Sequence, residues 1–449
     1  MEGVKVNVKA REIIKPSSPT SQNLKIFKLS LLDQIAPPLY VPWIFYYKIS
    51  STGRKESNAI ETQERINHLK QSLSQALTRI SPLAGRVKDN LFIECNDEGA
   101  DFSEAEVNCP LSEILRRPEV GVLDQLLPRD YRCSNPSMEL MQLAVQVNIF
   151  SCEGMAIGIC ALHKLVDGAT LSFFVNMWGA INASGGSAGD SFTPFFPGSQ
   201  LFPPRDLSVP RFEIPKAKCI TKRFLFPASK IAALKEIVLL ANKTDIIFSP
   251  TRIEVVSALI WRCMMEVSRE RSGCLSPSIM THVVNLRPRN DPVPLPESAS
   301  GNLSWLAIAP APAPATEKSP IELQDLVKQI RNAIKTIDKD YAREMQGENG
   351  FSLMSECLRQ VGDLVPEKVE VFRFISWAKF RLHEADFGWG KPIWVSTAGS
   401  AFKNTIVFIE KLTVGDDHDH GIEAWVSMDE QDMSIFEHNQ DLCSFVSLH

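Results

Sequence analysis

Residues 154–168 read Gly-Met-Ala-Ile-Gly-Ile-Cys-Ala-Leu-His-Lys-Leu-Val-Asp-Gly, and the pattern changes within this stretch. Met155–Leu162 is an apolar, β-prone run, and a similar run that starts at Met141 precedes it. The two runs flank a short turn at residues 151–154, which predicts a β-hairpin. From residue 168 to residue 181 (GATLSFFVNMWGAI) the pattern becomes helical. A strand followed directly by a helix indicates an α/β protein, with His163 at the junction.

Strands and helices are expected in both halves of the chain. Apolar residues at helical spacing predict an amphipathic helix over residues 61–80. Thr251 and Glu254 fit a capping box, in which each side chain accepts a hydrogen bond from the other residue's main chain at a helix start. Strand-like runs recur at residues 392–397, 404–410 and 421–427. These patterns predict two α/β domains, each with a mixed sheet and helices.

A change of composition divides the chain. Residues 184–215 contain the run SGGSAG and six prolines, without hydrophobic periodicity. Such a stretch is typical of an extended connection between domains. We therefore expect an N-terminal domain over residues 1–190, a crossover loop over residues 191–215 and a C-terminal domain over residues 216–449. A segment near residues 370–395 is expected to pack with the N-terminal domain.

Composition excludes several classes of protein. The 449 residues are 44% hydrophobic and 22% charged with a net charge of −5, which is typical of a globular protein. Nucleic acid and anionic membranes demand a basic face, so we expect neither as a partner. The ten cysteines form no CxxC pair, so no metal site is predicted. Without a signal sequence or a run of about 20 apolar residues, we expect a cytoplasmic protein.

His163 is the candidate general base. A histidine at the end of a strand is held by the sheet, and its unperturbed pKa of about 6.5 leaves much of it neutral near pH 7. The alternative is a core histidine with a satisfied hydrogen bond. Asp167 follows four residues later, and it could pair with His163, cap the next helix or bind a distant cation. We favour a structural role, because the chain changes direction between the two residues.

Two other patterns suggest different chemistry. Residues 185–189 match the GxSxG motif of serine hydrolases, but that motif requires a strand before the serine, and here a helix is predicted. Residues 416–420 (DDHDH) could hold a metal ion, but a polar run between two strands is usually a solvated turn. Phosphate-binding glycine motifs are absent.

Residues 386–390 read Asp-Phe-Gly-Trp-Gly. Two aromatic residues that alternate with two glycines predict a tight backbone anchored by buried rings.

These motifs together resemble the BAHD family of plant acyl-CoA-dependent acyltransferases. His163–Gly168 match the family motif HxxxDG, and residues 386–390 match DFGWG intact. Further matching segments occur in the expected order along the chain: IKPSSPT (14–20), LSLLDQ (29–34), PLAGR (82–86), NLR (285–287) and Gly301-Asn302. The chain is most similar to the branch that contains vinorine synthase and salutaridinol acetyltransferase, whose members mostly acetylate alcohols.

The resemblance implies a two-domain fold of the chloramphenicol acetyltransferase type, with a solvent channel between the domains. It implies that His163 is catalytic, that Asp167 pairs with Arg287 to support the site beside Gly168, and that the DFGWG residues (Asp386, Phe387, Gly388, Trp389 and Gly390) are structural. Trp377 is a candidate for lining the channel. Some members have a threonine two residues before this tryptophan, but Ile375 stands here, so no oxyanion donor is assigned.

The expected activity is transfer of an acetyl group from acetyl-CoA to a hydroxyl of an alkaloid or terpenoid alcohol, without an acyl-enzyme. Acyl-CoA would be a co-substrate, no cofactor would be bound permanently, and a monomer is the family's usual state. Alternatives are a larger aliphatic or aromatic acyl group, N-acylation of an amine, and a non-catalytic binding protein on the same scaffold.

Overall fold

The computed structural model describes most of the chain in eleven ranges. These are residues 3–49, 55–128, 141–152, 154–186, 192–206, 219–241, 249–312, 321–364, 369–400, 402–411 and 420–447. The chain divides into two compact units. The first unit is Met1–Arg211, Leu295–Leu303 and Phe380–Ala398, and the second is Phe212–Pro294, Ser304–Lys379 and Gly399–His449.

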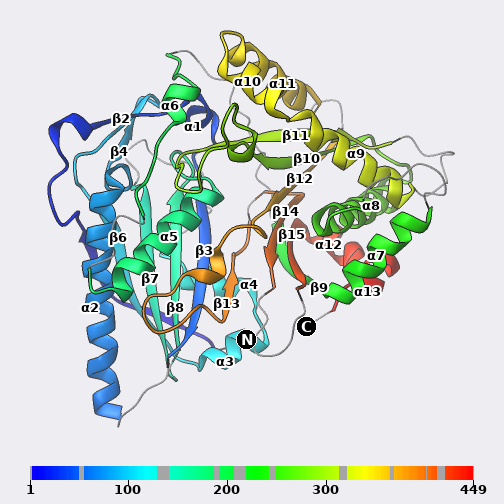
Figure 1. The fold of residues 1–449 in the computed structure, drawn as a ribbon. Coiled ribbons are helices and arrows are strands. Elements are labelled where there is room, and N and C mark those ends of the chain that lie inside the picture. The colour runs from blue at the N-terminus through cyan, green and yellow to red at the C-terminus, as the bar shows by residue number, and fades with distance from the viewer. Residues whose placement is uncertain are drawn as a thin grey trace. The chain divides into compact units, whose positions relative to one another are not determined.

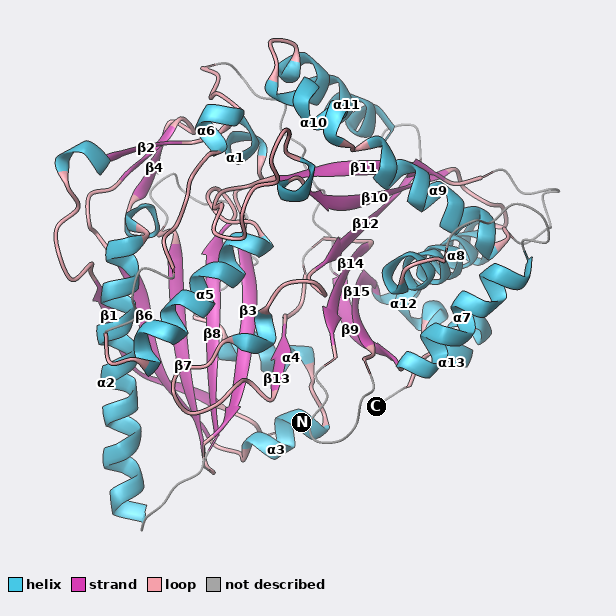
Figure 2. Cartoon of the chain, viewed as in Figure 1, coloured by secondary structure: helices cyan, strands magenta, loops and turns pink. Residues whose placement is uncertain are grey.

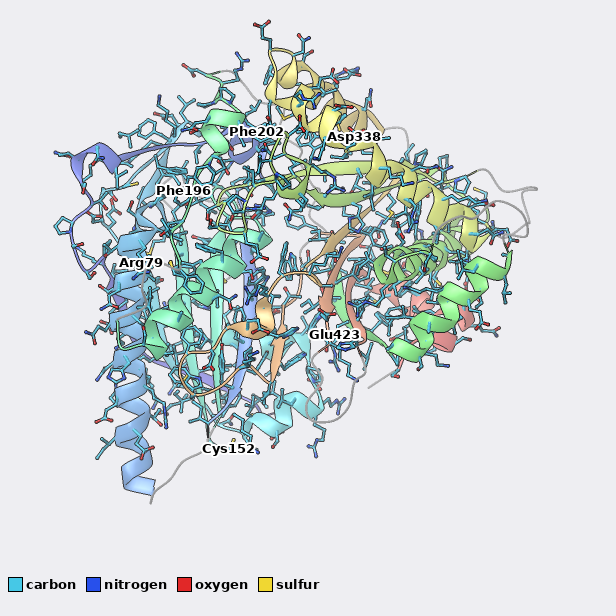
Figure 3. The ribbon with its side chains drawn as sticks, viewed as in Figure 1. Arg79, Cys152, Phe196, Phe202, Asp338 and Glu423 are labelled. Atoms are coloured by element: carbon cyan, nitrogen blue, oxygen red, sulfur yellow. The ribbon has the colours of Figure 1, made fainter. Side chains whose placement is uncertain are left out.

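The first unit is built on a six-stranded mixed sheet (Figure 1). Its strands lie in the order β1 (Val6–Ile14), β6 (Ala100–Val107), β7 (Leu143–Phe150), β8 (Gly154–Leu162), β3 (Tyr40–Lys48) and β13 (Trp394–Ser396). The β6–β7 pair is parallel, and the other pairs are antiparallel. Strands β7 and β8 form the predicted hairpin, and Cys152, labelled in Figure 3, lies in its turn. Because β8 is interior to the sheet and buried along its whole length, its sequence is apolar without alternation.

Two long helices of the first unit, α2 (Lys55–Arg79) and α5 (Gly168–Ala183), lie on the same side of this sheet (Figure 2). They pack against each other, and the indole nitrogen of Trp178 in α5 lies 3.0 Å from Ser72 Oγ and 3.3 Å from the main-chain oxygen of Leu69 in α2. The predicted helix over residues 61–80 is therefore confirmed as part of α2. The remaining elements are short: α1 (Leu31–Ile35), α3 (Leu111–Arg116), α4 (Val120–Leu123), α6 (Gly198–Leu201), and a small sheet of β2 (Ile26–Lys28), β5 (Phe92–Glu94) and β4 (Arg86–Lys88).

The second unit has its own six-stranded mixed sheet. The order is β11 (Ser304–Pro310), β10 (Ser278–Asn285), β12 (Glu370–Ser376), β14 (Thr405–Glu410), β15 (Ile422–Asp429) and β9 (Cys219–Phe226), with parallel pairs on both sides of β12. Its helices are α7 (Ala228–Ala241), α8 (Arg252–Ser272), α9 (Leu323–Thr336), α10 (Lys339–Gln346), α11 (Gly350–Leu364), α12 (Glu430–Phe436) and α13 (Gln440–Phe445).

Helix α8 provides much of the buried core of the second unit, because thirteen of its residues are buried. It begins with the predicted capping box: Glu254 N donates to Thr251 Oγ1 over 3.2 Å, and Thr251 N donates to Glu254 Oε2 over 2.7 Å. The local sequence signal is thus confirmed in full.

The division of the chain differs from the predicted boundaries in its details. The first unit extends to Arg211, and the segments Leu295–Leu303 and Phe380–Ala398 return to it. The first of these segments is tied to Phe195 by main-chain hydrogen bonds, from Phe195 N to Ser298 O (3.0 Å) and from Ser300 N to Phe195 O (2.6 Å). The second contributes β13, which pairs with β3, whereas β12 belongs to the second sheet. The assignment of residues 191–215 as a crossover stays a prediction.

The DFGWG segment is a tight turn fastened to α5 and β3. Asp386 Oδ1 accepts hydrogen bonds from Gly388 N (2.7 Å) and Gly390 N (3.0 Å). The Phe387 ring meets the Trp178 ring edge to face with centroids 4.9 Å apart, and Phe387 is 1% exposed. Asn182 of α5 donates to Phe387 O over 2.6 Å. A self-bonded turn and a buried ring therefore fix this segment.

Both glycines of this turn have positive φ angles, +98° at Gly388 and +105° at Gly390. A Cβ on Gly388 would lie 3.2 Å from Ala183 Cα, whereas nothing lies within 4 Å of a Cβ on Gly390. Gly390→Ala should therefore cost about 1–3 kcal/mol of backbone strain alone, and Gly388→Ala should cost that strain plus a clash with α5. We expect a lower melting temperature for Gly388→Ala than for Gly390→Ala in differential scanning fluorimetry. Equal melting temperatures would contradict the contact with α5.

Candidate active site

His163 lies one residue beyond the end of β8, as the sequence predicts. Its main-chain nitrogen donates to Leu39 O over 2.8 Å, which continues the pairing of β8 with β3 past the last paired residue, Leu162. The residue is half-buried. The two strands therefore hold the backbone of His163 in place.

The imidazole is held through one of its two nitrogens. His163 Nδ1 lies 2.9 Å from Asn302 Oδ1, and Asn302 Nδ2 donates to His163 O over 2.7 Å. Asn302 therefore contacts both the ring and the main chain of His163. Within the described ranges of the chain, no hydrogen bond joins Nε2 of His163 to another residue, so only Nδ1 is held by the protein.

Asn302 is in turn held by Asp33 of the short helix α1. Asp33 Oδ1 accepts hydrogen bonds from Asn302 N (2.9 Å) and Asn302 Nδ2 (2.8 Å), and Asp33 Oδ2 accepts from Ser30 N (2.9 Å) and Ser30 Oγ (2.6 Å). Asp33 is 1% exposed. Burial raises the pKa of the Asp33 carboxyl above its ordinary value of 3.8, although the donors of Ser30 and Asn302 oppose this shift.

The motif that contains His163 also braces α1. Lys164 Nζ donates to Gln34 O over 2.9 Å, and Lys164 is buried. The Gln34 side chain donates to Asn90 O and to Arg205 O, each over 2.9 Å. Because these contacts fix the end of α1, they also fix the position of Asp33.

Asp167 is the N-cap of helix α5. Its Oδ1 accepts from Thr170 N at 2.8 Å and lies 2.8 Å from Thr170 Oγ1, and its Oδ2 accepts from Leu303 N over 3.1 Å. Thr170 Oγ1 also accepts from Gly301 N over 3.0 Å. No hydrogen bond joins Asp167 to the imidazole of His163 within the described residues. Of the roles considered for Asp167, the geometry shows the helix cap, which also binds the segment that contains Asn302.

Helix α5 connects the two sequence motifs. At its first residue, a Cβ on Gly168 would lie 2.3 Å from Cε2 of Phe380, so only glycine leaves room for that ring. On a later turn, a Cβ on Gly179 would lie 2.8 Å from Asp386 O, the first residue of DFGWG. The helix that Asp167 caps therefore contacts Phe380 at its start and packs against the DFGWG segment with its later turns.

Two predicted site residues belong to the second unit. Arg287 is buried, and its main-chain nitrogen donates to Asn285 Oδ1 over 3.0 Å. Trp377 is also buried, and its main-chain nitrogen donates to Phe408 O over 2.8 Å. The pairing of Arg287 with Asp167 and the place of Trp377 in a channel stay predictions.

The rival motifs gain no support. Helix α5, rather than a strand, precedes the GxSxG pattern, and Ser187 lies outside the described residues. Residues 416–419 also lie outside them. Among the described residues no group of His, Cys, Asp and Glu side chains could hold a metal ion. In the same part of the chain, no helix combines the length and apolar character needed to cross a bilayer.

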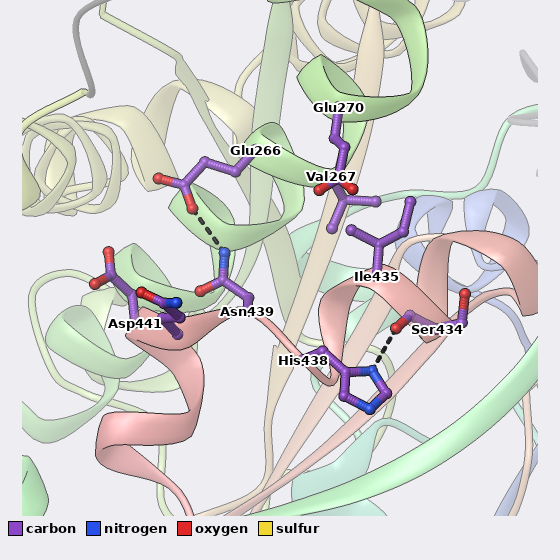
Figure 4. A pocket seen from close by; sticks show the side chains of 9 residues that line it. Glu266, Val267, Glu270, Ser434, Ile435, His438, Asn439 and Asp441 are labelled. Atoms are coloured by element: carbon purple, nitrogen blue, oxygen red, sulfur yellow. Dashed lines mark hydrogen bonds between the residues drawn. The ribbon is translucent and has the colours of Figure 1, made fainter.

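A hollow of about 620 Å³ lies on the helical side of the second unit (Figure 4). Its lining is mostly polar, with Glu266 and Glu270 from α8 and His438 and Asn439 from the region between α12 and α13. Asn439 donates to Glu266, and His438 bonds to Ser434 O, as the dashed lines in Figure 4 show. It contains none of the predicted site residues.

Sequence reasoning did not assign a role to Asp33 or Asn302. Both occur in segments that match the family, and the spacing of Ser30 and Asp33 is that of a capping box, which α1 contains. This signal identifies a helix start, but it does not indicate that Asp33 also binds a residue 269 positions away.

Comparison with known proteins agrees with these motifs and with this fold. The family model described as "Transferase family" matches residues 4–443. Akuammiline synthase 2 of Alstonia scholaris is 34% identical over 98% of this chain and 97% of its own. Limonoid 21-O-acetyltransferase of Melia azedarach is 38% identical over 98% of each chain. The crystal structure of vinorine synthase is similar with a TM-score of 0.80, at 31% identity over 99% of each chain.

The chain therefore belongs to the BAHD transferase family and is an acyl-CoA-dependent acyltransferase. The predicted two-domain α/β fold with mixed sheets and helices is confirmed. The predicted class of enzyme is confirmed as well.

Asp167→Ala should lower both stability and activity, because it removes the cap of α5 and leaves the buried Leu303 N without this acceptor. Loss of a cap costs about 0.5–2 kcal/mol, and an unsatisfied buried donor costs about 1–3 kcal/mol more. Asp338→Ala is the matched control, since Asp338 caps α10 through Tyr341 N and is labelled in Figure 3. We expect Asp338→Ala to lose stability only by the cap and to keep its activity. Thermal melts and initial rates for the two variants test this, and equal losses would refute the wider role of Asp167.

Proposed function

We propose that this acyltransferase transfers an acetyl group from acetyl-CoA to a hydroxyl of an alkaloid or terpenoid alcohol of plant specialised metabolism. The names of the relatives support this donor and acceptor class, because limonoid 21-O-acetyltransferase and related plant enzymes are named as O-acetyltransferases. The reaction needs a base, two substrates in contact and no permanently bound cofactor.

The observation that carries the proposal is the state of the His163 ring. One ring nitrogen and the main chain are held by Asn302, while Nε2 has no partner among the described residues. A base must be rigid enough to be aimed and must keep one nitrogen free for the proton that it accepts. His163 meets both requirements.

The proposed reaction proceeds by direct transfer. Nε2 of His163 accepts the proton of the acceptor hydroxyl as the hydroxyl oxygen forms a bond to the thioester carbonyl carbon. The resulting tetrahedral intermediate collapses, the carbon–sulfur bond breaks, and the protonated imidazole returns its proton to the departing thiolate. The products are the ester and free coenzyme A. Because the thioester is already activated and both substrates are held together, no acyl-enzyme is needed.

A larger acyl donor and an amine acceptor are the other outcomes to test. They require the same base and differ only in the shape of the substrate pockets. A cytoplasmic monomer that binds neither nucleic acid nor membrane is part of the same proposal. Assays with acetyl-CoA and longer acyl-CoA donors, each offered paired alcohols and amines, separate these alternatives.

His163→Ala should lower kcat/KM by about 10²–10⁴-fold, the usual contribution of a general base. The measurement is release of free thiol from acetyl-CoA, followed with DTNB against a panel of alkaloid and terpenoid alcohols. His438→Ala is the matched control, because His438 is exposed and its ring bonds to Ser434 O, so we expect this variant to keep its activity. Acceptor-dependent release that survives in His163→Ala would refute His163 as the base.

The pH dependence follows from the surroundings of His163. Burial lowers the pKa of the imidazole below 6.5. The residue's own main-chain carbonyl, the charge of Asp167 and Asn302 oppose this shift, whereas the charge of Lys164 adds to it. A lowered pKa keeps the imidazole neutral to more acidic pH. We therefore expect kcat/KM to rise with pH through a midpoint below 6.5 and then to stay level through neutrality. Chromatographic detection of the ester over a pH series measures this, and a midpoint above 6.5 would contradict it.

A further inference from the structure

The amide of Asn302 has one chemically consistent orientation. Its Nδ2 lies within reach of two acceptors, Asp33 Oδ1 at 2.8 Å and His163 O at 2.7 Å. Its Oδ1 lies 2.9 Å from Nδ1 of the His163 ring. A carboxylate and a carbonyl oxygen can only accept. If the amide were turned over, its oxygen would face both of them without a hydrogen. The amide nitrogen must therefore point to Asp33 and to His163 O, and the amide oxygen must face Nδ1.

This orientation decides where the proton of neutral His163 is placed. The amide oxygen of Asn302 is an acceptor, so the hydrogen bond over 2.9 Å requires a hydrogen on Nδ1. A neutral imidazole carries one hydrogen, and Nε2 is then left with its lone pair. The nitrogen that lacks a protein partner is thus also the basic one.

We propose that Asn302 is a positioning residue that holds neutral His163 in the Nδ1–H tautomer, and that Asp33 holds Asn302 in the orientation this requires. The inference rests on the proposed function, in which His163 is the base. Asn302 touches neither substrate in this role. It acts through His163, by directing the lone pair of Nε2 toward the acceptor hydroxyl.

Asp33 is suited to this role by its own contacts. Its two oxygens accept hydrogen bonds from two donors of Ser30 and two of Asn302. Because all four groups are donors, they favour the ionised form of Asp33, whose two oxygens can only accept hydrogen bonds. An amide at position 33 would turn a donor toward either the Ser30 main chain or the Asn302 main chain. The carboxylate therefore keeps Nδ2 of Asn302 turned away from the ring.

A purely structural role is the alternative, since Asn302 could simply anchor the segment Leu295–Leu303. Thr170 offers a matched control, because its hydroxyl accepts from Gly301 N over 3.0 Å in the same segment without touching the imidazole. Thr170→Val loosens that segment and leaves the contact with His163 in place. A structural role predicts the same defect for both residues, whereas the positioning role predicts a change of tautomer only for Asn302.

The experiment is ¹⁵N NMR of the full chain labelled at histidine, which distinguishes a protonated ring nitrogen from one with a lone pair. The signals of His163 are assigned by their loss in His163→Ala. The variants are Asn302→Leu, which removes the acceptor beside Nδ1, and Thr170→Val. Each is recorded at neutral pH, and kcat/KM is measured with acetyl-CoA and the best alcohol of the panel.

The expected result is a hydrogen on Nδ1 in the wild type and in Thr170→Val, and its transfer to Nε2 in a large fraction of Asn302→Leu. We expect kcat/KM of Asn302→Leu to fall roughly 10–100-fold, the range found for partners that orient a metal-binding histidine.

A hydrogen on Nε2 in the wild type would overturn the inference without any variant, and so would an unchanged tautomer in folded Asn302→Leu. Should Asn302→Leu not fold, the wild-type spectrum still decides the question, because it shows directly which ring nitrogen of His163 carries the hydrogen. Activity that survives His163→Ala would instead refute the proposed function, while the tautomer would still be read from the spectra.

Discussion

The structure around His163 depends on one buried interaction, the pair of hydrogen bonds from Asn302 to the carboxylate of Asp33. It joins a short helix near the start of the chain to a segment 269 residues later. A buried carboxylate is tolerated only when donors surround it, and here two residues supply four. The interaction places Asn302 against the ring and the main chain of His163. The position of the Asp33 carboxylate therefore determines the orientation of the imidazole.

Helix α5 connects the residues around His163 to the rest of the first unit. Its N-cap, Asp167, binds Leu303 beside Asn302, and its later turns pack on the DFGWG segment through Gly179 and Asn182. The two sequence motifs, which lie about 220 residues apart, are therefore parts of one packed assembly. A larger residue in place of Gly168 would displace the ring of Phe380, and one in place of Gly179 would displace the main-chain oxygen of Asp386. In this chain the DFGWG segment is fixed by these contacts with α5 and by the hydrogen bonds of Asp386 to its own glycines.

Much of the local structure could be predicted because its causes are local. The hairpin of β7 and β8, the helix that follows His163 and the capping box at Thr251 all follow from residues close together in the chain. The prediction was weaker where pairing is distant. No pattern in the sequence indicated that Leu295–Leu303 would leave its neighbours and return to the first unit, where it bonds to Phe195. A segment near residues 370–395 was expected to pack with the N-terminal domain, but the expectation did not specify that β13, three residues long, pairs with β3 while β12 belongs to the second sheet.

The sequence by itself determined the family, the two-domain α/β class and the position of His163 at the end of a strand, because motifs and hydrophobic periodicity are properties of short stretches. Tertiary structure alone decided what surrounds the imidazole. Asp33, His163 and Asn302 meet only when strands β3 and β8 pair and the segment near Asn302 returns to them, and such contacts between distant residues depend on the whole packing of the unit. The chemistry of the base could thus be located from the sequence, whereas the groups that orient it could be found only in the fold.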